Sequence, residues 1–322
     1  MDLQNTATEL FLGIDIGSTT AKIVLRDGDT ILLERYERHF SQVREKTAEL
    51  LRLAKEIAGD KAVKAAISGS AGLGLAEAAH IPFVQEVFAT AQVVKLREPD
   101  TSCVIELGGE DAKIIFFKGG IDERMNGSCA GGTGAFIDQM ATLLNITVDE
   151  LDKLSLNAGR LYPIASRCGV FAKTDIQPLL NQGARKEDVA ASIYQAVVNQ
   201  TIAGLAQGRK IDGKVLFLGG PLYYCRGLRT RFKETLKLDD EHAVFPEYAR
   251  FAVALGASYY AEQQPEIFTA DELLSLVENA ANVSSGKGRL KPLFRNEEEY
   301  SEFKHRHAAS SVKNADIEKY SG

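Results

Sequence analysis

Two stretches of the chain repeat one pattern of apolar and polar positions. Residues 11–25 form an apolar run, a turn of small residues and a second apolar run, and residues 103–117 do the same. Each copy predicts a β-hairpin whose first strand ends in an acid and whose turn exposes backbone N–H groups. The copies keep the same residue types in register: Asp15 with Glu106, Gly17 with Gly108, Ala21 with Ala112, and Lys22 with Lys113. This self-similarity indicates two α/β domains of related topology rather than two unrelated hairpins.

Apolar spacing elsewhere predicts the rest of the framework. We expect helices over 41–58, from about 135, over 186–206 and over 247–262, and strands over 62–68 and 214–218. The first domain is expected over 10–100, with helix 247–262 returning to it, and the second over 101–246. A helical and linker-like tail is expected over 263–322, including a helix over 271–280 and a charged helix with Asn296 as its N-cap.

Composition and charge exclude several classes of protein. The chain has 322 residues, of which 45% are hydrophobic, and its formal net charge is −6. It therefore has a core to bury and no electrostatic attraction to nucleic acid or to anionic lipid. No apolar run approaches a membrane span, and the first residues do not resemble a secretory signal, so we expect a cytoplasmic protein. The four cysteines do not suggest a disulfide scaffold.

Three glycine-bearing turns follow predicted strands, at Gly17–Thr20, Gly108–Gly109 and Gly219–Gly220. Backbone N–H groups in such turns form anion-binding concavities, and Ser18, Thr19 and Thr20 add hydroxyl groups. None of the turns has the P-loop or the Rossmann spacing, so those folds are disfavoured. The order of the turns indicates nucleotide binding in a cleft.

The charged residues beside these turns suit a magnesium–phosphate site. Lys22 can offset phosphate charge, while Asp15 and Glu106 end paired strands and can organise a hydrated Mg²⁺. No residue stands out as a general base.

Two cysteines stand just ahead of predicted helices. Cys129 lies within 126–134 and Cys168 within 166–171, where helix N-termini favour the thiolate form. A [4Fe–4S] cluster generally takes four thiolates, so two such cysteines suffice only if two chains share one cluster. Spacing alone leaves open that both are ordinary free cysteines. Cys103 and Cys225 are expected to be buried packing residues.

Together, four segments resemble the activators of 2-hydroxyacyl-CoA dehydratases, which belong to the BadF/BadG/BcrA/BcrD ATPase group. The segments are 14–22, 106–113, 126–134 and 166–171, and the resemblance extends over about 10–262. It implies the actin, sugar-kinase and Hsp70-ATPase fold, and a homodimer bridged by one [4Fe–4S] cluster. It also implies that ferredoxin or flavodoxin supplies an electron, which MgATP hydrolysis drives to a dehydratase or a related iron–sulfur reductase.

The resemblance also implies roles for individual residues. Cys129 and Cys168 would ligate the cluster, and Asp15 would face Mg²⁺ through water. The implied ATP/ADP-binding residues are Gly17, Ser18, Thr19, Thr20, Lys22, Gly108, Gly109, Glu110, Asp111, Gly132, Thr133, Gly219 and Gly220. Glu106, Glu110 and Thr90 depart from the family, which more often has Asp, Gln and His at these positions.

Two other functions share the phosphate turns: a small-molecule kinase of the sugar-kinase type, and a non-redox actin-like ATPase. Neither needs cysteines or iron. Residues 293–307 look like the segment that joins two activator-like modules in large fused relatives. A tandem sister module, in place of a second chain, would then supply the other two cysteines.

Overall fold

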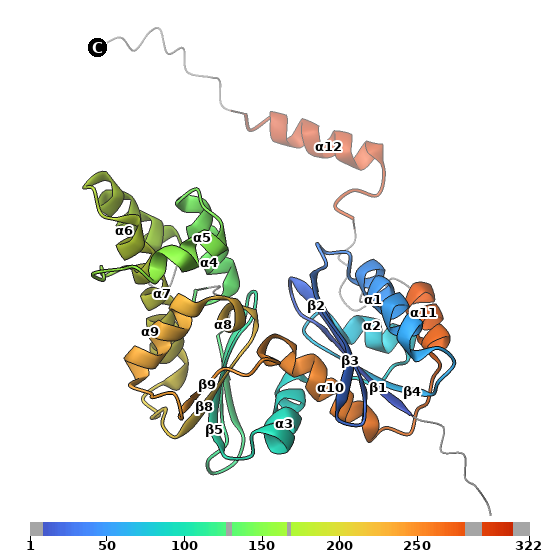
Figure 1. Cartoon of the computed structure of the whole chain (residues 1–322). Helices are drawn as coiled ribbons and strands as arrows, with labels where there is room; N and C mark the ends of the chain where they lie inside the picture. Colours follow the sequence, from blue (N-terminus) through green and yellow to red (C-terminus); the bar gives the residue numbers. More distant parts are fainter. Residues whose placement is uncertain (1–8, 127–130, 166–168, 281–291, 312–322) are drawn as a thin grey trace, which may run out of the picture. The chain divides into compact units, whose positions relative to one another are not determined.

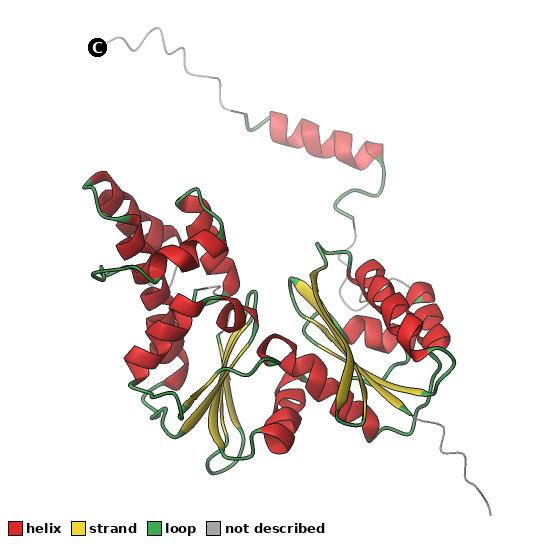
Figure 2. Cartoon of the chain, in the orientation of Figure 1, coloured by secondary structure: helices red, strands yellow, loops and turns green. Residues whose placement is uncertain are grey.

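Two mixed β-sheets frame the larger part of the protein (Figures 1 and 2). The computed structural model describes residues 9–126, 131–165, 169–280 and 292–311. Backbone contacts divide the chain into a large unit, 1–282, and a small unit, 283–322.

The first sheet has the strand order β3-β2-β1-β4. β1, β2 and β3 form an antiparallel meander, and β4 lies parallel to β1 on its other side. One face is covered by α1, α2 and α11, which share a buried apolar cluster with β1, β2 and β4. The elements are β1 (Leu10–Ile16), β2 (Thr20–Asp27), β3 (Thr30–Arg38), β4 (Val63–Ser68), α1 (Val43–Ala58), α2 (Leu73–Ala79) and α11 (Ala270–Asn279).

The second sheet has the order β7-β6-β5-β8-β9. β5, β6 and β7 are antiparallel, and β8 lies parallel to β5 on its other side. The strands are β5 (Thr101–Leu107), β6 (Ala112–Phe116), β7 (Asp122–Met125), β8 (Lys214–Leu218) and β9 (Ala243–Val244).

The two sheets confirm the repeat that the sequence predicts. Each begins with an antiparallel meander and adds a parallel strand beside the first strand of that meander. Asp15 pairs in register with Lys22, and Glu106 pairs in register with Lys113. The alignment of acid with lysine therefore reflects equivalent positions in two related hairpins.

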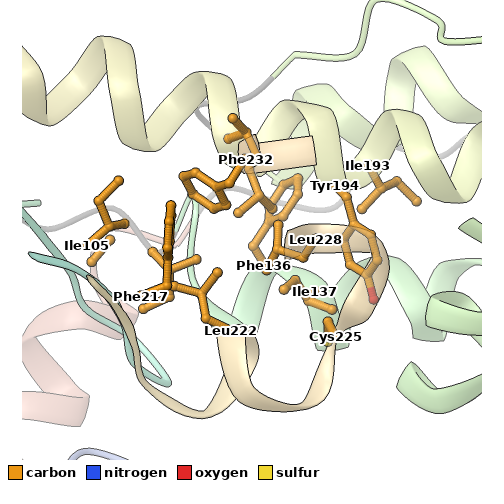
Figure 3. Close-up of a cluster of buried hydrophobic side chains, with 14 of the residues drawn as sticks. Ile105, Phe136, Ile137, Ile193, Tyr194, Phe217, Leu222, Cys225, Leu228 and Phe232 are labelled. Atoms are coloured by element: carbon orange, nitrogen blue, oxygen red, sulfur yellow. The ribbon is translucent and has the colours of Figure 1, made fainter. Parts of the chain in front are cut away.

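A large apolar cluster joins the second sheet to its helices (Figure 3). Phe136, Phe217, Leu228 and Phe232 are buried in it, and the rings of Phe217 and Phe232 lie 5.5 Å apart. The helices on this side are α4 (Gly134–Leu143), α5 (Val148–Ser155), α6 (Gly169–Asn181), α7 (Lys186–Thr201), α8 (Gly220–Tyr224) and α9 (Arg226–Leu236).

Two helices, α3 (Glu86–Arg97) and α10 (Ala252–Glu262), lie between the sheets (Figure 1). α10 packs on β1, β4 and α3. Val94 of α3 joins Val104 and Leu216 of the second sheet in a separate apolar cluster. These two helices are therefore the packed connection between the halves of the large unit.

Most expected elements are present, with differences at their ends. The helix expected over 186–206 ends at Thr201 and continues as a π-turn, Ile202–Ala206. The helix expected over 247–262 begins at Ala252, after a 3₁₀ turn. Within the part of the chain that the structure describes, no helix combines the length and the apolar composition that a membrane span needs.

The range 263–322, expected to be a tail, contributes one helix to the core of the large unit. α11 buries Leu273 and Val277 in the cluster shared with α1. The expected N-cap in the small unit is confirmed, because the Asn296 side chain accepts a hydrogen bond from the Glu299 N–H at the start of α12 (Glu297–Ala308).

Candidate functional site

The two hairpin turns touch each other. The Gly17 N–H donates to the Thr20 carbonyl at 3.0 Å, and the Gly108 N–H donates to the Asp111 carbonyl at 2.7 Å. A Cβ atom on Gly109 would lie 2.3 Å from Oγ1 of Thr19, so a side chain at Gly109 would displace that threonine. The first and second phosphate-type turns therefore form one continuous surface.

Helix α4 begins directly on the second turn. The N–H groups of Gly134 and Ala135 donate to the carbonyls of Gly108 and Gly109 at 3.0 and 2.8 Å. Gly132 and Thr133 immediately precede this helix, and Thr133 is its buried N-cap residue. The turn and the helix are thus held as one element.

The third turn, between β8 and α8, approaches the same region from the second sheet. Gly219 has a φ of +93°, and a Cβ on it would lie 2.0 Å from the Leu107 carbonyl oxygen. Its N–H donates to the Ala249 carbonyl at 2.9 Å. Glycine is required here both by the left-handed conformation and by the close approach to β5.

A cavity of about 40 Å³ lies between the first two turns. It has room for at least one water molecule, which needs roughly 10–15 Å³. The structure brings most of the expected phosphate and magnesium residues to its wall: Asp15, Gly17, Ser18, Thr19, Thr20, Lys22, Glu106, Gly108, Gly109 and Asp111. Glu86 and Lys113 also line it.

The first hairpin carries an ion pair at this cavity. Nζ of Lys22 lies 2.6 Å from Oδ2 of Asp15, and both side chains are largely buried. Burial opposes the charged form of Lys22, but the Asp15 carboxylate and Tyr36 outweigh it, so that the pKa of Lys22 is raised. Lys22 therefore stays protonated at this cavity.

The second hairpin is arranged differently. Burial, and then the nearby charge of Asp15, raise the pKa of Glu106 to about 7, although Lys22 opposes the shift. Oε2 of Glu106 is buried without a hydrogen-bond partner among the described residues. Lys113, the register partner of Glu106, forms its ion pair with Glu86 instead. Burial lowers the pKa of Lys113.

A larger pocket of about 360 Å³ opens beside the three glycine-bearing turns. Thr19, Thr20, Gly109 and Gly220 of the turns line it, together with Tyr36, Arg38, Asp138 and Tyr224. Nη2 of Arg38 on β3 lies 3.0 Å from Oδ2 of Asp138 on α4, which bridges the two halves at the wall of the pocket. Among the described residues, Glu110, Gly132, Thr133 and Gly219 line neither cavity.

Cys129 and Cys168, the expected cluster ligands, lie outside the described residues. Gly169, which begins α6, contacts α4, since a Cβ on it would lie 2.6 Å from Oε1 of Gln139. The helices that follow the two cysteines in sequence therefore touch. The described residues contain no group of three or more His, Cys, Asp or Glu side chains placed to hold a metal ion.

The other two cysteines are buried, as expected. Cys103 and Cys225 are free thiols in the core of the second domain. Burial raises the pKa of Cys103 to about 12 and that of Cys225 to about 11. Both therefore stay protonated at neutral pH.

Several residues of the site have no local signal in the sequence. Tyr36 and Arg38 belong to β3, an edge strand that the hydrophobic pattern did not predict, and Asp138 belongs to an exposed face of α4. Glu86 reaches the cavity from α3, which was also not predicted. Alternation along 30–38 would have indicated a strand, but its position beside the pocket depends on the tertiary fold.

A family model matches residues 12–261, which is most of the chain. The chain belongs to the BadF/BadG/BcrA/BcrD ATPase family. It is 31% identical to the (R)-2-hydroxyglutaryl-CoA dehydratase activating ATPase of Acidaminococcus fermentans over 78% of this chain and 96% of that protein. It is 28% identical to the 2-hydroxyisocaproyl-CoA dehydratase activator of Clostridioides difficile over 80% of this chain and 98% of that protein.

Solved structures of family members have the same fold. The A. fermentans (R)-2-hydroxyglutaryl-CoA dehydratase component A aligns with a TM-score of 0.68 at 29% identity, covering 78% of this chain and 96% of that one. The Clostridium difficile activator of 2-hydroxyisocaproyl-CoA dehydratase with bound ADPNP aligns with a TM-score of 0.66 at 26% identity, covering 85% and 99%. The fold is the expected α/β fold of the actin, sugar-kinase and Hsp70-ATPase class.

Proposed function

We propose that this family member hydrolyses ATP to drive an electron from a low-potential donor to a dehydratase-like iron–sulfur enzyme or a related reductase. The observation that carries the proposal is the contact between the two hairpin turns at the start of α4, beside a pocket of about 360 Å³. The names of the A. fermentans and C. difficile relatives describe activators of dehydratases. One of the aligned activators was solved with an ATP analogue.

In this proposal each turn contacts a different part of the nucleotide. Gly17–Thr20, with Lys22, and Gly108–Asp111 face the phosphates, and Gly132 and Thr133 support the second turn through α4. Gly219 and Gly220 lie on the adenosine side. We propose that residues 10–100, together with α10, form one domain and that residues 101–246 form the other, with ATP or ADP bound between them.

The acids at the small cavity fit a hydrated Mg²⁺. Asp15 and Glu106 both line it, and Oε2 of Glu106 is buried without a protein partner among the described residues. Mg²⁺ in phosphate sites keeps several waters and takes one or two carboxylates. When bound, the ion would offset phosphate charge, while Asp15 and Glu106 orient its waters.

Cys129 and Cys168 are the proposed ligands of a [4Fe–4S] cluster shared by two copies of the chain, or by this module and a tandem sister module. The cluster supplies one-electron transfer, with ferredoxin or flavodoxin as donor. Cys103 is enclosed in the core of the second domain, and Cys225 is buried at the wall of the pocket of about 360 Å³, so neither is suited to complete a four-thiolate set within one chain. A reducing cytoplasm would keep all four as thiols or thiolates.

Helix α4 offers a physical link between ATP and this cluster. Its first N–H groups are bonded to Gly108 and Gly109, and its N-terminus follows Cys129 by a few residues. A change in the second turn therefore moves the start of the helix. Because a ligand shifts an equilibrium only by its differential affinity for the two states, ATP should strengthen binding of the acceptor more than ADP does. Equal acceptor affinity with both nucleotides would contradict this coupling.

The decisive test is the iron and sulfide content after strictly anaerobic purification and reconstitution. We expect about four irons per two chains, and loss of iron in Cys129→Ser and Cys168→Ser. Cys103→Ala is the matched control and should retain iron. A protein that binds ATP but takes up no iron would instead be a small-molecule kinase or a non-redox actin-like ATPase.

A further inference from the structure

The acid and the lysine form an ion pair with each other in the first hairpin but not in the second. Asp15 and Lys22 are register partners and form an ion pair at 2.6 Å. Glu106 and Lys113 are the equivalent partners in the second hairpin, but Lys113 pairs with Glu86 of α3. Glu86, an acid that does not belong to the repeat, therefore lines the cavity of about 40 Å³ between the first two turns.

Glu86 is placed to act on a small molecule in that cavity. It is the first residue of α3 and lines the cavity of about 40 Å³ together with Thr19, Gly108 and Gly109. Its side chain keeps 20% of its surface exposed, whereas the Asp15 side chain keeps 5%. Asp15 is paired with Lys22 and Glu86 with Lys113, and of these two paired acids Glu86 is the more accessible to a molecule in the cavity.

We propose that Glu86 is the general base of ATP hydrolysis and that Lys113 positions it. The inference rests on the proposed function, because it requires that ATP binds with its terminal phosphate at the two turns. A water in the cavity attacks the γ-phosphorus, the bond from that phosphorus to the β,γ-bridging oxygen breaks, and ADP leaves with the bonding electrons. The proton of the water passes to a carboxylate oxygen of Glu86 and is later released to solvent. Lys113 holds that carboxylate toward the turns.

The test is Glu86→Gln, which keeps the shape of the side chain and removes its basicity. General acid–base catalysis contributes about 10²–10⁴-fold, so we expect the single-turnover rate of ATP hydrolysis to fall at least about 100-fold. The affinity for ATP, measured by calorimetry, should stay close to that of the wild type. Bound nucleotide recovered by rapid quench should therefore be ATP rather than ADP.

Glu98→Gln, at the opposite end of α3 from Glu86, is the matched control. Glu98 follows the last residue of α3 and pairs with Lys214 of β8 at 2.6 Å, and its side chain is also 20% exposed. It lines neither the cavity of about 40 Å³ nor the pocket of about 360 Å³. This variant should hydrolyse ATP at the wild-type rate, which shows that loss of a Glu–Lys pair on α3 is not itself the cause.

The outcomes separate this inference from the function it rests on. Wild-type hydrolysis by Glu86→Gln would overturn the role of Glu86 and leave the ATPase proposal intact. A loss of ATP affinity as large as the loss of rate would also overturn it, because Glu86 would then be a binding residue. A wild-type protein that neither binds nor hydrolyses ATP would overturn the proposed function. Lys113→Met should lower the rate with ATP affinity retained, and an unchanged rate would remove Lys113 from the proposal.

Discussion

At the scale of single residues, Arg26 is a charged side chain buried in the core, where it needs several hydrogen-bond acceptors. It is almost fully buried on β2 and donates to Oγ and the carbonyl of Ser258, to the Gly28 carbonyl and to the Glu262 carboxylate. Its guanidinium also lies 4.5 Å from the ring centre of Phe11 and 4.4 Å from that of Tyr259. A planar group with five donors fits this set of acceptors, and an ammonium does not.

Arg26→Lys should therefore lower the free energy of unfolding by about 2–4 kcal/mol, because buried acceptors lose their donors. Arg35→Lys is the control. Arg35 lies on β3 and donates to the exposed carbonyl of Glu34, so its replacement should change stability by less than about 0.5 kcal/mol. Urea unfolding of both variants measures the difference, and equal effects would contradict the argument.

The buried thiols predict a loss of stability at alkaline pH. In the folded protein, burial raises the pKa of Cys103 to about 12 and that of Cys225 to about 11, from the ordinary thiol pKa of 9.0. Above pH 9 the unfolded chain therefore binds fewer protons than the folded one, and stability falls as the pH rises toward 11. The contribution is about 1.4 kcal/mol per pH unit for each thiol. Unfolding measured from pH 8 to 10.5 should show a shallower decline in Cys103→Ala than in the wild type.

At the scale of elements, glycine permits the contact between α3 and α10. A Cβ on Gly256 of α10 would lie 2.0 Å from the carbonyl oxygen of Ala89 on α3. The backbones of the two helices therefore touch at this point. Because α3 carries Glu86 and α10 packs on β1, this contact sets how the proposed base stands relative to the first phosphate turn.

Gly256→Ala should separate the helices and cost about 3 kcal/mol, as overpacking does in cores. Gly74→Ala is the matched control, since Gly74 lies in α2 and, apart from its chain neighbours and the adjacent backbone of its own helix, no atom would lie within 4 Å of the added Cβ. Alanine there should raise stability by about 0.5 kcal/mol through the unfolded state. Thermal unfolding distinguishes the two, and a neutral Gly256→Ala would show that α3 and α10 can shift without cost.

At the scale of the whole molecule, the large unit is two related sheets joined by α3 and α10 and bridged by Arg38 and Asp138. Its apolar clusters include α11, which follows the family-matched region 12–261. α12, in the small unit, has no buried residue. The core of the large unit thus extends beyond the matched region but only as far as Ala280 among the described residues.

Two truncations test this boundary. A chain that ends at Asn282 should keep the melting temperature of the wild type, because it retains α11. A chain that ends at Gln264 loses Leu273 and Val277 from the core, and at about 1.5–3 kcal/mol per buried side chain it should be destabilised by about 5 kcal/mol. Differential scanning calorimetry measures both, and equal melting temperatures would show that α11 adds nothing to the core.

The two hairpins, their acid–lysine register and the three glycine turns can all be predicted from the sequence. These features are local, because a strand, a tight turn and the next strand are adjacent in the chain and carry their own periodicity. For the same reason the sequence alone selects Asp15, Lys22, Glu106 and Gly109, which the structure places around one cavity. The N-cap at Asn296 follows from side-chain chemistry within one turn of helix.

The residues that complete the candidate site come together only when the chain is folded. Glu86, Arg38 and Asp138 belong to three elements that are far apart in the sequence. No local sequence pattern predicts that the packing of these elements brings the three side chains close to the glycine-bearing turns. The sequence likewise does not predict that Lys113 pairs with Glu86 rather than with Glu106, because the second hairpin repeats the pattern of the first. Side-chain pairing depends on which elements meet in space, and that is set by burial of apolar faces distributed over the whole chain.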